Sequence, residues 1–172
     1  RVIATVRDVA GRARVQALGA QALTVDVANP ASVSGLAWQL DGEEIDVALL
    51  ERAADAAAAG ADAIVCEGVG GLMVPLTPDY LVRNLAVGLG HPLVVVADAG
   101  LGTINHTLLT IEAAWTAELE VRAVVLNRWP AKPGRLEESN RETIAALTGV
   151  AVLTLAGIDL ARPAGWPRLG LL

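Results

Sequence analysis

Short apolar runs alternate with stretches of helical periodicity along most of the chain. The strand-like runs cover residues 2–6, 23–27, 62–66, 92–97, 121–126 and 150–155. Between them, apolar side chains recur at helical spacing over residues 9–18, 30–40, 46–59, 79–89, 104–118 and 135–147. Strands separated by helices are joined by right-handed crossovers into a parallel sheet. The pattern therefore predicts an α/β fold, a doubly wound, mostly parallel sheet with helices on both faces.

The run from Ala63 to Cys66 is apolar throughout, which is typical of a strand buried on both faces of a sheet. Glu67 ends the run, and Gly68, Gly70 and Gly71 follow. Ligands of open α/β sheets bind at the carboxyl ends of the strands, and glycines let backbone N–H groups approach an anion. The stretch predicts a Mg²⁺ ligand beside a phosphate-binding turn. The alternative is an ordinary turn whose acid faces solvent.

Two further strand ends carry polar residues. In the stretch ADAGLGTINHT, residues 97–107, glycines precede Thr103 at the start of a helix whose free N–H groups can hold a carboxylate or phosphate. Asn127 ends the next strand, and its amide can pair with adenine. The alternatives are an ordinary capped loop and an asparagine that only turns the chain. His106 could be a base, and its alternative is a hydrogen-bonded structural group. Asp98 is a second candidate metal ligand by position.

Composition narrows the class of protein. The formal charge is −6 and the 13 basic residues are scattered, which argues against a nucleic-acid surface. The single cysteine, Cys66, has no internal disulfide partner, and its apolar run predicts a reduced, buried thiol in a cytoplasmic protein. No apolar run is long enough to cross a membrane and no leader is evident, so we expect neither a membrane nor a secretory protein.

The polar strand ends carry a resemblance to a known family. The segments EGVGGLMVPL, ADAGLGTINHTLLTIEAA, AVVLNRWP and ESNRETIAALTGVAVL resemble the dethiobiotin synthetase family of P-loop enzymes, over about residues 45–157. The resemblance implies an ATP- and Mg²⁺-dependent ligase of biotin biosynthesis, which closes a cyclic urea from 7,8-diaminononanoate and CO₂. It also implies a homodimer that shares the substrate site between its subunits.

The resemblance assigns roles at the matching positions. Glu67 would bind Mg²⁺, and the nucleotide phosphates would lie against Gly68, Val69, Gly70 and Gly71. The adenine would contact Asn127 and Arg128, and the carboxylate of the substrate would bind Thr103 and Asn105.

Residues 1–50 resemble a different family. ATVRD and ALTVDVANPASV are similar to strands of the short-chain dehydrogenase/reductases, which implies an NADP 2′-phosphate contact at Arg7 and an adenine contact at Asp26. Neither the glycine motif of that family nor its Tyr-x-x-x-Lys occurs here. We therefore expect a hybrid chain: a Rossmann-like βαβα fragment over 1–44, the dethiobiotin-synthetase-like domain over 45–157, and an irregular tail over 158–172.

The phosphoryl-transfer lysines of the P-loop family have no counterpart in these residues. The 172 residues contain no Gly-x-x-x-x-Gly-Lys-Thr loop, and their one lysine, Lys132, follows the strand that ends at Asn127. No catalytic residue is identified, and impaired activity is expected. The alternatives are a non-catalytic nucleotide-binding fragment and a remnant of an NADP-linked short-chain reductase.

Overall fold

The computed structural model describes residues 3–6, 12–13, 16–17, 21–24, 47–68, 70–159 and 161–171. The chain forms two compact units, residues 1–44 and residues 45–172. In the first unit, β1 (Ile3–Val6) pairs in parallel with β2 (Gln21–Thr24). This confirms two of the predicted strands. Arg7, Asp26 and the helix predicted over residues 30–40 lie outside the described residues.

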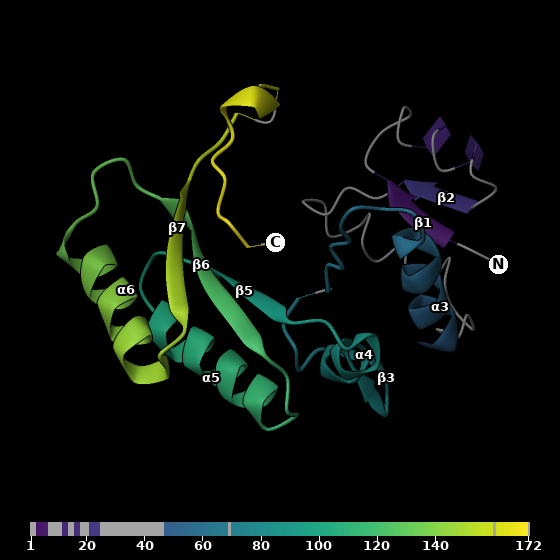
Figure 1. The fold of residues 1–172 in the computed structure, drawn as a ribbon, viewed down its shortest axis with the longest axis horizontal. Coiled ribbons are helices and arrows are strands. Elements are labelled where there is room, and N and C mark those ends of the chain that lie inside the picture. The colour runs from purple at the N-terminus through teal and green to yellow at the C-terminus, as the bar shows by residue number, and fades with distance from the viewer. Residues whose placement is uncertain are drawn as a thin grey trace. The chain divides into compact units, whose positions relative to one another are not determined.

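The second unit is built on a parallel sheet of three strands in the order β5–β6–β7 (Figure 1). The strands are β5 (Leu93–Asp98), β6 (Val121–Trp129) and β7 (Ala151–Ala156). Helix α5 (Thr103–Trp115) connects β5 to β6, and helix α6 (Arg135–Thr148) connects β6 to β7. The parallel α/β architecture predicted from the hydrophobic pattern is confirmed.

Both connecting helices pack on the same face of this sheet. Ile111 of α5 and Ile144 of α6 form a fully buried cluster with Val124 and Leu126 of β6. Burial of these four side chains stabilises the packing of α5 and α6 on the sheet, by about 1.5–3 kcal/mol for each side chain. β6, the central strand, is buried on both faces from Ala123 to Leu126.

The remaining elements of the second unit precede the sheet in sequence. Helix α3 (Val47–Ala58) contacts α4 (Val82–Leu89), and a short hairpin of β3 (Pro75–Thr77) and β4 (Tyr80–Leu81) leads into α4. The sequence predicts one helix over 79–89, but its first residues instead form the hairpin strand. Among the described residues of the C-terminal tail, a 3₁₀ turn at Pro163–Gly165 is the one regular element.

Local sequence explains where α6 begins and ends. The Glu137 carboxylate accepts a hydrogen bond from the Gly134 N–H at 2.7 Å, and Glu137 and Glu138 place negative charge in the first turn. Gly149 follows the helix with φ of 67°, a left-handed conformation that glycine adopts without steric cost. These signals fix the helix within one residue of its predicted range.

The strand predicted over residues 62–66 is wrong. Residues 63–68 have no regular secondary structure, Val65 is 82% exposed and Cys66 is exposed, so the predicted burial of the thiol is also wrong. An apolar run becomes a buried strand only where a neighbouring strand and covering helices accept it. Among the described residues, no strand pairs with this run.

Tyr80 is expected to make the stability of the second unit depend on pH in the alkaline range. Its hydroxyl donates to the Glu51 carboxylate at 3.3 Å; burial first, and then the charge and hydrogen bond of Glu51, raise the pKa of Tyr80 above its ordinary value. The unfolded chain then loses this proton first, so the contribution to stability is present below about pH 10 and lost at higher pH. Urea midpoints of the wild type and Tyr80→Phe, from about pH 8 to about pH 11, should diverge above about pH 10. Parallel curves would contradict the assignment.

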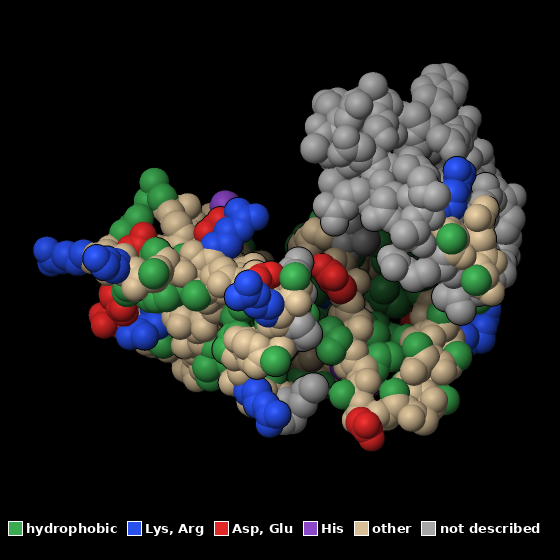
Figure 2. All heavy atoms as spheres, turned by 90° about the horizontal axis from the view of Figure 1, so that it is seen from above, with side chains coloured by type: hydrophobic (Ala, Val, Ile, Leu, Met, Phe, Trp, Pro, Cys, Tyr) green, Lys and Arg blue, Asp and Glu red, His purple; other side chains and the backbone are tan. Residues whose placement is uncertain are grey.

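No helix in the described ranges combines the length and the apolar character that a membrane crossing requires. On the face shown in Figure 2, Lys and Arg side chains occupy several separate places and do not form one continuous patch.

Candidate functional site

The carboxyl ends of β5 and β6 bring two of the predicted polar strand ends together. Asp98 and Asn127 are direct partners in the parallel register, and the alternation of the strands puts both side chains on the face opposite α5 and α6. The backbone of β5 then continues as the loop that leads to α5. An amide and a carboxylate therefore lie side by side at the edge of the sheet where ligands of open α/β folds bind.

A small cavity lies between the end of β5 and the start of α5. Its volume is about 150 Å³, and Asp98, Leu101, Thr103 and His106 are among its lining residues, with Val95, Val96, Ala97, Thr107 and Thr110. Leu101 is 91% exposed and Val96 is 64% exposed, so the cavity opens beside an apolar surface. It can accept a small group that has both polar and apolar contacts.

The first turn of α5 places its predicted site residues differently. Thr103 is buried, and its hydroxyl oxygen lies 3.4 Å from that of Thr107, whereas Asn105 is exposed. Gly102 precedes the helix with φ of 89°, a left-handed conformation that favours glycine. The amides of Ile104 and Asn105 belong to the first turn, where N–H groups have no acceptor further back in the helix.

Asn127 and Arg128 form a distorted end to β6. The Asn127 side-chain oxygen accepts a hydrogen bond from the Arg128 N–H at 2.8 Å. Arg128 has φ of 56°, in the left-handed region, and the register with β7 shifts at this point. Such backbone strain costs about 1–3 kcal/mol and clusters at functional sites. This bond uses one of the two lone pairs of the oxygen, so the Asn127 side chain can still offer an acceptor and its NH₂ group to a ligand.

Backbone hydrogen bonds join the turn that contains Gly68, Gly70 and Gly71 to the start of α4. The Val82 and Arg83 N–H groups donate to the carbonyls of Val74 and Leu72 at 2.9 and 2.8 Å. Gly70 has φ of 74°, and a Cβ at Gly68 would lie 2.8 Å from the Val82 side chain. The turn itself therefore uses the first two N–H groups of α4, at Val82 and Arg83.

Glu67 is exposed and lines neither described cavity. In the described part of the chain, no three His, Cys, Asp or Glu side chains are grouped to hold a metal ion. A single carboxylate nevertheless fits Mg²⁺ chemistry, because Mg²⁺ commonly takes one or two protein carboxylates and completes its shell with water and substrate phosphates. Glu67 offers one such carboxylate, and its role as a Mg²⁺ ligand stays a prediction.

The structure thus makes Asp98 and Asn127 neighbours on adjacent strands, and it places Thr103 with Asp98 in the lining of the small cavity. It holds Gly68, Gly70 and Gly71 in a separate turn on α4, whereas Val69 lies outside the described residues.

Sequence reasoning missed one residue near the site. Asn140 of α6 is 5% exposed, and its side-chain NH₂ donates to the carbonyls of Ala99 and Gly100 at 3.0 and 3.1 Å. Its signal in the sequence is a polar residue four positions from both Leu136 and Ile144, on the apolar stripe of the helix.

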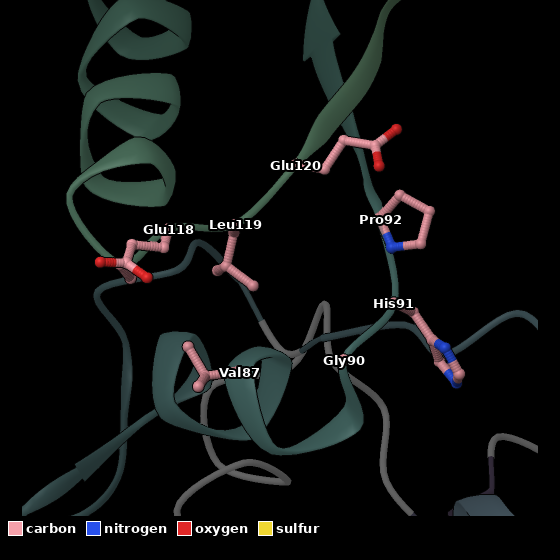
Figure 3. Close-up of a pocket in the computed structure, with 8 residues that line it drawn as sticks. Val87, Gly90, His91, Pro92, Glu118, Leu119 and Glu120 are labelled. Carbon is pink, nitrogen blue, oxygen red and sulfur yellow. The ribbon is translucent and has the colours of Figure 1, made fainter.

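A second, open cavity of about 370 Å³ lies at the opposite end of β5, among Val87, His91, Glu118, Leu119 and Glu120, with Gly90, Pro92 and Ala117 (Figure 3). The Glu118, Glu120 and His91 side chains point in different directions (Figure 3). They do not converge on one position, so this cavity offers no organised charge for a ligand.

Comparison with known proteins shows that the chain is similar in sequence to several enzymes that share one name. It is 46% identical over 112 residues to the ATP-dependent dethiobiotin synthetase BioD of Anaeromyxobacter dehalogenans, covering 65% of this chain and 50% of that protein. The protein of the same name in Chlorobaculum tepidum is 41% identical over 111 residues, 64% of this chain and 46% of the relative. The chain therefore spans about half the length of the curated relatives it matches.

A family model described as an AAA domain matches residues 12–160, which includes most of the segment that resembles a dehydrogenase. Because the match covers most of the 172 residues, the chain belongs to the AAA domain family.

Proposed function

We propose that this chain contributes part of the active site of a dethiobiotin synthetase, an ATP-dependent ligase that closes a cyclic urea from 7,8-diaminononanoate and CO₂. The observation that carries the proposal is the shared edge of β5 and β6, where Asp98, Asn127 and the entrance to α5 lie together. The identity of 46% to a relative with that name supports the same chemistry.

The residues of the chain have distinct tasks in this proposal. Asn127 donates its NH₂ group to the adenine, and Arg128, whose backbone N–H bonds to the Asn127 side chain, contacts the same base. Asn105 and the free N–H groups of the first turn of α5 hold the substrate carboxylate, helped by the positive end of the helix dipole. Thr103 contributes a wall of the cavity.

The phosphates would lie along the glycine turn at Gly68, Val69, Gly70 and Gly71, with Glu67 as one ligand of Mg²⁺. When bound, ATP with Mg²⁺ supplies the phosphoryl group that activates the substrate for ring closure. Because the 172 residues contain no P-loop lysine, we propose that this chain alone binds nucleotide weakly and catalyses slowly or not at all.

We further propose a cytoplasmic homodimer. Support for the dimer comes from Val96 and Leu101, two exposed apolar side chains at the mouth of the cavity. Apolar surface beside a site commonly marks an interaction surface.

The test is isothermal titration of the 172-residue chain with ATP and Mg²⁺, followed by an assay for dethiobiotin from 7,8-diaminononanoate, bicarbonate and ATP. Binding without turnover is the expected result. No heat at millimolar nucleotide would reject both the ligase and the nucleotide-binding alternative. Turnover at an ordinary enzyme rate, at or above about 1 s⁻¹, would refute the proposed impairment.

A further inference from the structure

A side chain of α6, Asn140, makes hydrogen bonds to the loop between β5 and α5. The Asn140 NH₂ group donates one hydrogen bond to the carbonyl of Ala99 and one to the carbonyl of Gly100. Ala99 is 3% exposed and Asn140 is 5% exposed, so water has little access to the bond between them, whereas the bond to Gly100 is partly buried. The Gly100 carbonyl also accepts the Thr103 N–H at 3.4 Å, which ties the same peptide unit to the start of α5.

These bonds determine which way the N–H groups of the loop point. In a planar trans peptide the carbonyl and the following N–H point in opposite directions. The Ala99 and Gly100 carbonyls point toward α6, so the Gly100 and Leu101 N–H groups point away from it. Within the described ranges, neither N–H donates a hydrogen bond to another residue. Two successive N–H groups of this kind are backbone donors that an anion can accept.

We propose that Asn140 is a positioning residue that fixes the Ala99–Gly100 carbonyls and thereby presents the Gly100 and Leu101 N–H groups to an anionic group of the substrate at the entrance of α5. This inference rests on the proposed function for the identity of the substrate. It adds a residue of α6, and two backbone donors of the loop, to the site assigned to α5.

The choice of asparagine follows from the two acceptors. One NH₂ group supplies two donors, which is the number that the two carbonyls require. The substitution Asn140→Asp would keep the shape of the side chain but set a carboxylate against both carbonyls. Asn140→Ala would leave the buried Ala99 carbonyl without a partner and the Gly100 carbonyl with only the 3.4 Å bond from the Thr103 N–H. Ile144→Val, one turn further along the same helix, lowers stability through the core without touching the loop and is the matched control.

The first measurement is amide hydrogen exchange of the full chain without ligand. We expect Asn140→Ala and Asn140→Asp to accelerate exchange in residues 99–105 by about tenfold or more relative to β6. The reason is that the loop opens more often once the two hydrogen bonds from residue 140 are lost. Ile144→Val should change exchange broadly, with no selective effect on the loop. If Asn140→Asp fails to fold, Asn140→Ala decides the result. Loop exchange that matches the control would overturn the proposal.

The second measurement is titration with 7,8-diaminononanoate. We expect Asn140→Ala to weaken binding by about tenfold or more and Ile144→Val to leave it within about twofold of the wild type. Unchanged affinity in Asn140→Ala would overturn the role of Asn140 in substrate positioning. If the wild type does not bind this probe, the substrate role of Asn140 is rejected together with the proposed function. Hydrogen exchange still decides separately whether Asn140 orders the loop, so the two failures are distinguishable.

Discussion

Truncation of Leu126 to alanine is expected to lower the free energy of unfolding by about 2–5 kcal/mol. Leu126 is fully buried on the central strand, in the cluster with Ile111, Val124 and Ile144. The cost combines the lost transfer free energy of the side chain with the free energy of the cavity that remains. The cavity remains because the surrounding strands and helices are packed against one another and cannot move in to fill it. A domain of this size is stable by about 5–15 kcal/mol, so the variant loses a large share.

The matched control is Leu109→Ala, which removes the same atoms from a side chain that is 60% exposed on α5. Its effect should stay within about 0.5 kcal/mol, because little apolar contact is lost and alanine favours the helix. Urea denaturation followed by circular dichroism gives both values. Equal losses in the two variants would show that the buried cluster does not form as described.

An exchange of the two polar residues at the sheet edge is expected to weaken ATP binding by about tenfold or more. In the double variant Asp98→Asn with Asn127→Asp, the net charge is unchanged. The new carboxylate at position 127 can still accept the Arg128 N–H, which preserves the bond now made at 2.8 Å. What position 127 loses is its NH₂ group, the proposed donor to adenine.

Asp98→Asn alone is the control for this exchange, because it leaves Asn127 intact. It should retain the ATP affinity of the wild type, measured by isothermal titration in the presence of Mg²⁺. If the single variant loses as much affinity as the double variant, Asp98 rather than Asn127 contacts the nucleotide. If neither variant changes the affinity, the adenine is bound elsewhere.

Several features were accessible from local sequence. The periodic segments that became α3, β5, α5, α6 and β7 lie within about three residues of their predicted bounds, because caps such as Gly149 and unbroken apolar runs specify them locally. The polar residues at the ends of β5 and β6 were also visible, since a change from apolar to polar marks where a buried strand ends.

Other features depend on contacts between distant segments. The apolar run Ala63–Cys66 has strand composition but no paired neighbour among the described residues, so composition alone misassigned it. Asn140 was missed because its partners, the carbonyls of Ala99 and Gly100, lie about 40 residues away in sequence.

The sequence by itself determined the α/β class, the bounds of most helices and strands in residues 45–172, and the polar character of two strand ends. Only the tertiary structure decided that Asp98 and Asn127 are register partners, that Thr103 is buried, and that α6 holds the loop before α5. The physical reason is that periodicity and caps act within a few residues of each other, whereas strand register and the satisfaction of buried carbonyls are set by segments that meet only after the chain has folded.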